Sequence, residues 1–323
     1  MQPQIAVVIP YYQTEPGILA RAIESIAAQT HRGPIQVIVV DDASPLPAAA
    51  QLHELALPPS VSVEIVQRPN GGPAAARNTG LSRVSHGARH VAFLDSDDRW
   101  SPEHLARASL ALSQGYDFYF ADLLQLDQSV GAFARGGKIM ASEHTPLAQG
   151  EELHAYRGDM FDQIIRGNVI GTSTVVFDRS RFPSIRFREE YYSAGEDYLC
   201  WMDFAQAGAR FAFSARCEAT YGRGVNVYSG ARFGTAKHLE RVHNEFKYRH
   251  ATARLHRVTP EQKRFLEAKK AELREDFTRD LLHMLRHGQL PVRILARQFM
   301  LDPLLAAEPF RLVARQVLHR PAS

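Results

Sequence analysis

Cysteine is scarce in this chain, which has two among 323 residues, Cys200 and Cys217. Two cysteines cannot form the disulfide framework of a small secreted domain or a zinc site built on four thiolates. No apolar run approaches the roughly 20 residues that a membrane-spanning helix needs. The N-terminal stretch "MQPQIAVVIPYY" also lacks the basic flank and the cleavage site of a signal peptide. The sequence therefore predicts free thiols and a cytoplasmic location.

A strong excess of charge of one sign is absent as well, because the net charge is only +3. This small value hides an asymmetry along the chain. Residues 237–323 contain 18 Lys and Arg against 10 Asp and Glu, whereas residues 1–236 carry a net charge of −5. The basic segment has no nucleic-acid recognition motif, so we expect no nucleic-acid partner. The two parts of the chain are expected to meet different partners.

Apolar runs and helical patterns alternate over the first 100 residues. Runs at 4–12, 35–44, 61–69 and 90–98 are short and rich in β-branched residues, which is typical of buried strands. Helical patterns separate them, for example at 16–29. Strands that alternate with helices predict an α/β fold whose central sheet is mostly parallel and covered on both faces.

The pattern changes further along the chain. Residues 117–126, 171–180 and 210–223 are expected to form strands, and 196–208 a helix that ends at Gly208. From residue 235 on we expect helices, one of them opened by Thr259 and Pro260 and continuing to about His287. These patterns predict a domain over 1–234 and a helical, basic region over 235–323.

Acidic residues follow two of the predicted strands. Asp41 and Asp42 end one strand, and "HVAFLDSDDRW" (90–100) places Asp95, Asp97 and Asp98 after another. Aspartate is also common at turns and helix N-termini, which is the plainer interpretation of either group. In mostly parallel sheets, however, ligands bind beyond the carboxyl ends of the strands. Mg²⁺ and similar cations take one or two carboxylates together with substrate phosphates. The cluster therefore favours a metal ion that carries a nucleoside diphosphate.

Five segments in this order resemble the family 2 inverting glycosyltransferases of the GT-A fold: "VVIPYYQ" (7–13), "VIVVDDAS" (37–44), "NGGPAAARNTGL" (70–81), "VAFLDSDDRW" (91–100) and "GEDYLCW" (195–201). The resemblance covers roughly residues 4–230. It implies a GT-A domain at 1–234, with a nucleotide-binding half at about 1–100 and an acceptor half at about 101–234. The implied reaction is transfer of a sugar from a nucleotide-diphosphate sugar, with a UDP-sugar favoured.

The resemblance also implies roles for individual residues on the donor side. Pro10 and Tyr12 are expected beside the base and ribose, and Asp42 at the base edge with Asp41 in support. Arg77 is expected to face the nucleotide, and Arg223 to lie over the diphosphate; a surface position for Arg77 and core packing for Tyr12 are the alternatives.

Two further groups complete the implied site. Asp95 and Asp97 match the DXD motif that contacts ribose and metal, Mg²⁺ or Mn²⁺. The choice between Asp97 and Asp98 as the metal ligand stays open. Asp197 matches the catalytic base, which removes the proton of the acceptor hydroxyl, and Glu196 is expected to orient a neighbour or the acceptor. Both acids would also suit the first turn of a helix.

The sequence leaves several partners open. The implied acceptor is a saccharide or a lipid-linked saccharide used in surface polysaccharide or glycolipid synthesis. The basic C-terminal helices are expected to complete the core, to pair two subunits in a homodimer, or to contact the inner face of the cell membrane. A catalytically idle nucleotide-sugar-binding or scaffolding protein is the main alternative. A glycoside hydrolase that uses Asp97 and Asp197 is disfavoured, because it needs no nucleotide site.

Overall fold

The computed structural model describes residues 4–52, 55–150, 152–191, 195–224 and 230–311. The chain divides into two compact units. One, here called the sheet unit, comprises Met1–Tyr192 and Glu196–Val225. The other, the helical unit, comprises Ser193–Gly195 and Asn226–Ser323. The boundary predicted at residue 234, and the division of the first domain near residue 100, stay predictions.

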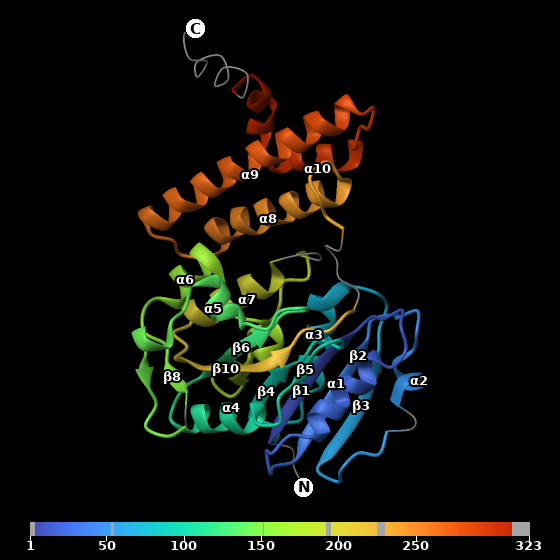
Figure 1. Cartoon of the computed structure of the whole chain (residues 1–323), viewed down its shortest axis with the longest axis vertical. Coiled ribbons are helices and arrows are strands. Elements are labelled where there is room, and N and C mark those ends of the chain that lie inside the picture. The colour runs from blue at the N-terminus through green and yellow to red at the C-terminus, as the bar shows by residue number, and fades with distance from the viewer. Residues whose placement is uncertain (1–3, 53–54, 151, 192–194, 225–229, 312–323) are drawn as a thin grey trace. The chain divides into compact units, whose positions relative to one another are not determined.

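The sheet unit is built on one central sheet (Figure 1). Its strands in the described residues are β1 (Ile5–Tyr11), β2 (Ile35–Asp41), β3 (Val61–Gln67), β4 (His90–Phe93), β5 (Arg99–Trp100), β6 (Phe118–Leu124), β7 (Thr145–Pro146), β8 (Leu153–Ala155), β9 (Val176–Asp178) and β10 (Phe211–Thr220). The strand order is β3-β2-β1-β4-β9-β6-β10-β8-β7, and β5 pairs with β10. Strands β1 to β4 are parallel to one another, and β6 is parallel to β10. The predicted mostly parallel sheet is confirmed.

Helices flank this sheet. Those of the sheet unit are α1 (Ile18–Ala27), α2 (Ala48–Leu52), α3 (Gly72–Arg83), α4 (His104–Ser113), α5 (Ala132–Gly136), α6 (Met160–Gly167) and α7 (Glu196–Gln206), with short 3₁₀ turns η1 (Ala141–Glu143) and η2 (Thr172–Thr174). The apolar stripe of α1 buries Ile18, Leu19, Ile23 and Ile26. Because helices cover both faces, every residue of β2 is buried.

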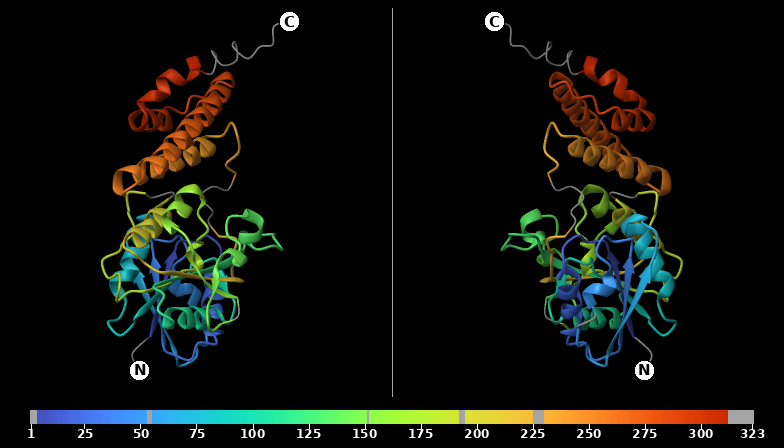
Figure 2. Two further views of the ribbon diagram at one scale, coloured as in Figure 1. Left: turned by 90° about the vertical axis from the view of Figure 1, so that its left-hand side faces the viewer. Right: turned by 90° about the vertical axis from the view of Figure 1, so that its right-hand side faces the viewer.

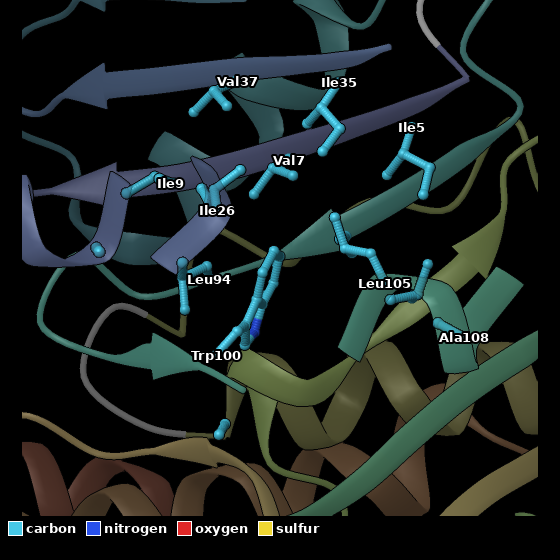
Figure 3. Close-up of a cluster of buried hydrophobic side chains, with 14 of the residues drawn as sticks. Ile5, Val7, Ile9, Ile26, Ile35, Val37, Leu94, Trp100, Leu105 and Ala108 are labelled. Atoms are coloured by element: carbon cyan, nitrogen blue, oxygen red, sulfur yellow. The ribbon is translucent and has the colours of Figure 1, made fainter. Parts of the chain in front are cut away.

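The core under α1 and α4 is a continuous apolar layer. Figure 3 shows side chains of β1 and β2 in contact with Ile26, Trp100 and Leu105. Burying this many branched side chains, at about 1.5–3 kcal/mol each, fixes the position of the strands. The strand ends that carry the aspartates are therefore held by a rigid scaffold.

One predicted strand is shorter than expected. Residues 171–180 form a strand at β9, but Thr172–Thr174 coil into η2 before it. The turn is favoured locally because both the backbone N–H and the hydroxyl of Thr174 donate to the Gly171 carbonyl. Strand β9 then runs antiparallel to both β4 and β6. This turn places Ser173 next to the end of β4, where its side chain becomes part of the site.

The helical unit contains α8 (Ala236–Leu255), α9 (Pro260–Arg286), α10 (Val292–Leu301) and η3 (Pro303–Ala307). Helices α8 and α9 lie side by side in both views of Figure 2 and share an apolar core around Phe246 and Phe277. Thr259 and Gln262 form a capping box at the start of α9, as its sequence predicts. In the described part of the chain, no helix combines the length and hydrophobicity that crossing a bilayer requires.

Candidate active site

The aspartates that end β2 are both buried and both fully engaged. Asp41 accepts the backbone N–H of Ser44 at 2.8 Å and of Ala48 at 2.9 Å, and thereby shapes the turn into α2. Asp42 accepts hydrogen bonds from the Arg68 guanidinium and from the backbone N–H groups of Gly71 and Gly72. Asp42 therefore orders the loop that leads from β3 into α3.

The aspartates after β4 differ from one another in exposure and partners. Asp98 is buried, and its carboxylate accepts from the Ser173 hydroxyl and, at 2.9 Å, from the Gly222 N–H. The Ser173 hydroxyl oxygen also accepts the Asp95 N–H at 3.0 Å. Burial raises the pKa of Asp98 well above its usual range, and the nearby Asp95 and Asp97 raise it further. Asp98 thus connects η2, the β4 tip and the end of β10.

Asp97 lies against the segment that follows β10. A Cβ atom at Gly222 would be 1.5 Å from the Asp97 carbonyl oxygen, so only glycine permits this approach. Burial, with the charge of Asp95, raises the pKa of Asp97 to about 6. No group of three or more His, Cys, Asp or Glu side chains converges on one point among the residues that the structure describes. Asp95, Asp97 and Asp98 therefore do not form a three-carboxylate metal cage.

Arg77 joins two parts of the site. It is buried in α3, donates from Nη2 to Asp95 Oδ1 at 2.7 Å and from Nη1 to Glu196 Oε1 at 3.2 Å, and its guanidinium lies 5.3 Å from the centre of the Phe187 ring. Burial opposes its charge, but the carboxylates of Asp95 and Glu196 outweigh this effect and raise the pKa of Arg77. The arginine is neither on the surface nor directed to open solvent.

Glu196 and Asp197 begin α7. Burial and the charge of Asp197 raise the pKa of Glu196 to about 7, although Arg77 opposes this shift. Burial also raises the pKa of Asp197, whose carboxylate accepts from the Thr172 hydroxyl at 3.3 Å and from the Tyr198 N–H at 2.8 Å. Both shifts are typical of functional sites, where acids are held away from bulk water.

A pocket of about 400 Å³ opens beside Asp197. Its walls come from the end of β6, from α5, from residues 168–172 and from Tyr221. Neither Asp42 nor any aspartate after β4 is among its lining residues. Asp197 lines this pocket, and its neighbour Glu196 is linked through Arg77 to Asp95.

Three other predicted residues differ in their exposure and partners. Pro10 is half-buried in β1, next to β2, and Tyr12 is 40% exposed just after β1. Arg223 is exposed and forms an ion pair with Asp127 at 2.9 Å. All three lie in the described residues, but the structure records no contact of theirs with the aspartates after β4.

Sequence reasoning did not single out Ser173, Gly222 or Arg68. Each acts by holding an aspartate: Ser173 and Gly222 hold Asp98, and Arg68 holds Asp42. The sequence offers one signal for such residues, namely small and polar residues in stretches expected to follow strands. That signal does not reveal which aspartate they meet.

Comparisons with known proteins identify the family. The family model described as glycosyl transferase family 2 matches residues 6–173. Over 227 residues the chain is 35% identical to the succinoglycan biosynthesis protein ExoW of Rhizobium meliloti (strain 1021), and the match covers 70% of each chain. The chain belongs to glycosyl transferase family 2.

Solved structures support the same fold. The crystal structure of S. aureus TarS 1-349 in complex with UDP-GlcNAc aligns with a TM-score of 0.59 at 17% identity, over 95% of this chain and 81% of that one. The chain covers 54% of a longer TarS structure. The mannosyltransferase PcManGT of Pyrobaculum calidifontis, in complex with GDP-Man and Mn²⁺, aligns with a TM-score of 0.55 at 16% identity, over 97% of this chain and 83% of that one. The predicted GT-A fold is confirmed.

Proposed function

We propose that this glycosyltransferase moves a sugar from a UDP-sugar to an acceptor hydroxyl with inversion at the anomeric carbon, and that Asp197 is the catalytic base. The observation that carries the proposal is the position of Asp197. Its carboxylate borders a pocket on one side, and Arg77 links the neighbouring Glu196 to Asp95 on the other. This arrangement suits a base that faces an acceptor while the donor lies at the strand ends.

The chemistry follows from that arrangement. Asp197 takes the proton of the acceptor hydroxyl while the oxygen attacks the anomeric carbon. The new bond forms from the face opposite the diphosphate, and the breaking bond leaves its electron pair on the diphosphate oxygen. One in-line displacement inverts configuration and needs no protein nucleophile. Thr172, whose hydroxyl donates to Asp197, keeps the carboxylate oriented toward the pocket.

The acids after β4 fit a divalent cation held partly by the donor. Asp98 is committed to Ser173 and Gly222, whereas the carboxylates of Asp97 and Asp95 are less enclosed. One or two carboxylates plus phosphate oxygens is the usual ligand set of Mg²⁺ in nucleotide sites, and Mn²⁺ prefers similar ligands. We assign Asp97, with Asp95, as the protein ligands. The cation would supply positive charge against the developing charge of the leaving diphosphate.

The donor's base and ribose are assigned to the ends of β1 and β2. Tyr12 is exposed there, beside Pro10, and Asp42 orders the loop at Asn70–Gly72. In this assignment Asp42 acts by shaping the loop around the base, with Asp41 fixing the preceding turn. Arg223 is assigned to the rim near the diphosphate, where its pairing with Asp127 would have to open.

The C-terminal helices are assigned to contact with an anionic membrane surface. Met300 and Phe310 are more than 70% exposed, and Arg293 and Arg297 share a face of α10 with Met300. Exposed apolar side chains beside cations are typical of peripheral lipid binding. Such contact would suit an enzyme of surface polysaccharide synthesis, as the likeness to ExoW favours.

A flotation assay with phosphatidylglycerol vesicles tests this assignment. The protein should float together with the vesicles. A protein that stays free of the vesicles and sediments as a dimer would instead assign this face to self-association.

A thermal-shift titration tests the donor assignment. UDP, UDP-glucose and GDP are added to the full chain with Mn²⁺, and again with EDTA. Binding to the native state raises the melting temperature by mass action. We expect UDP and UDP-glucose with Mn²⁺ to raise the melting temperature most. Chromatography of the UDP-glucose sample should also show slow release of UDP. Binding without any turnover on a panel of acceptors would support an idle scaffold, and no shift with any nucleotide would overturn the proposal.

A further inference from the structure

The pocket beside Asp197 has an unusual balance of charge. Its lining includes one carboxylate, that of Asp197, and two cations, Arg135 and Lys138. The uncharged side chains of Asn168, Tyr198 and Tyr221 also line it. Arg135 Nη2 donates to the neutral side chain of Gln125 at 2.7 Å. Within the described ranges, neither Arg135 nor Lys138 has a carboxylate within ion-pair distance. Within the part of the chain that the structure describes, the two cations of the pocket are thus not neutralised by a direct ion pair.

The two cations are held in place by the fold around them. Asp122, buried in β6, accepts the Phe133 N–H at 3.0 Å and so fixes the start of α5. The Phe133 ring packs against Phe120, which anchors the helix to the sheet. Lys138 follows α5 and lies over Gly167, where an added Cβ would be 2.4 Å from its Nζ. Arg135 and Lys138 therefore project from an ordered segment.

The donor's diphosphate does not account for these cations. The proposed donor site is built on the ends of β1, β2 and β4, and the pocket shares none of the aspartates found there. Asp197 lines the pocket, and a base must face the acceptor. An anion bound by Arg135 and Lys138 would therefore belong to the acceptor. Positive charge in a concave site with low-dielectric walls attracts such an anion strongly.

We propose that the acceptor is an acidic saccharide, and that Arg135 and Lys138 bind a carboxylate or phosphate close to the hydroxyl that Asp197 deprotonates. This inference rests on the proposed function and deepens it by naming a substrate class. Guanidinium groups bind both oxyanions through paired N–H donors, and an ammonium adds a point charge. Tyr198 and Tyr221 supply apolar faces and hydroxyls for the sugar ring itself.

Direct binding measurements on the full chain test this proposal. With UDP and Mg²⁺ present, saturation-transfer NMR titrations compare D-glucuronate, glucose 6-phosphate and neutral methyl glucoside. We expect at least one acidic probe to bind about tenfold tighter than methyl glucoside, since a charge-assisted hydrogen bond contributes enough for such a factor. Preference for glucuronate indicates a carboxylated acceptor, and preference for the phosphate indicates a phosphorylated one.

Variants then assign the effect to the two cations. Arg135 and Lys138 are exposed, so Arg135→Gln with Lys138→Gln should fold normally. The double variant should lose the preference for the acidic probe while its affinity for UDP is unchanged. Lys138→Arg should keep the preference, and the exposed Arg32→Gln serves as a matched control that also removes one positive charge.

Two results would overturn the proposal: equal binding of acidic and neutral probes by the wild-type protein, or a double variant that loses UDP affinity and keeps its preference among the sugars. Failure of the proposed function is a separate result. In that case UDP fails to bind the wild-type protein, whereas the comparison of probes still reports on the pocket.

Discussion

The aspartates after β4 and the pocket that Asp197 lines differ in the sign of the charge that they leave uncompensated. At the β4 tip, carboxylates crowd together, and the pKa values of Asp97 and Asp98 rise because burial, and then the neighbouring negative charges, disfavour ionisation. In the pocket, Arg135 and Lys138 lack carboxylate partners in the described chain. Burying carboxylates is costly unless a positive charge compensates them, whereas exposed cations that line a concave pocket attract an anion. The comparison indicates a cation bound on one side and an anion on the other.

The largest effect on this comparison is expected from neutralising Asp197, which lines the pocket and follows the Arg77-bound Glu196. Asp197→Asn keeps the size of the side chain but removes the base. We expect turnover to fall by about 10³-fold, within the range of general-base catalysis, while UDP still raises the melting temperature. The measurement is the initial rate of UDP release together with the thermal shift.

Asp162→Asn is the matched control for this variant. Asp162 is also an acid in the first turn of a helix, where it pairs with Arg166, and it does not line the pocket. It should retain wild-type turnover. Normal turnover in the Asp197→Asn protein would show that another group is the base and that the pocket is not the acceptor side.

The second test separates two neighbouring aspartates by function. Asp97→Asn should lower turnover by about 10²-fold and weaken the effect of Mn²⁺ on UDP binding, because it removes a proposed metal ligand. Asp98→Ala should mainly lower stability, because Ser173 and the Gly222 N–H lose their acceptor. A buried unsatisfied group costs about 1–3 kcal/mol, which is several degrees in melting temperature. If only Asp98→Ala lost the effect of Mn²⁺ on UDP binding, Asp98 and not Asp97 would be assigned as the metal ligand.

Much of the fold was predictable because its signals are local. The strands β1 and β2 are continuous apolar runs, and the capping residues of α9 adjoin the helix that they start. The role of Arg77 was not predictable, because its partners Asp95 and Glu196 are 18 and 119 residues away. Likewise, nothing near Asp98 in the sequence shows that Ser173 and Gly222 would enclose it. The sequence identified the acids; the fold determines which of them are already engaged.

Arg77 offers a test of how the two sides are linked. Arg77→Lys keeps the positive charge but removes the planar guanidinium, whose separate N–H groups donate to Asp95 and Glu196. We expect turnover to fall about tenfold with little change in the concentration of UDP needed for half-maximal thermal shift. Arg89→Lys is the control, since Arg89 also donates twice to one aspartate, Asp178, but its own side chain is exposed, just before β4. Equal losses in both variants would mean that Arg77 acts through stability alone.

The smallest predicted effect is a change in the pH dependence of stability. Glu196 titrates at about 7 in the folded protein against an ordinary 4.5, so the native state holds its proton more tightly than the unfolded chain does. Between about pH 4.5 and 7 the native state therefore binds more protons, and stability falls as pH rises through this window. The uncharged side chain in Glu196→Gln resembles the protonated glutamic acid. This variant should therefore lack the part of the stability loss that comes from ionisation of Glu196.

Melting curves of the two proteins at pH 5, 6, 7 and 8 provide the measurement. The melting temperature of Glu196→Gln minus that of the wild type should rise by a few degrees from pH 5 to pH 8. Taking the difference cancels the titrations of Asp97 and Asp98, which both proteins share. A difference that stays constant with pH would mean that Arg77 offsets the burial of Glu196 completely. Glu196 would then be an ordinary ion-pair partner of Arg77, and the uncompensated negative charge of the site would lie only on the aspartates after β4.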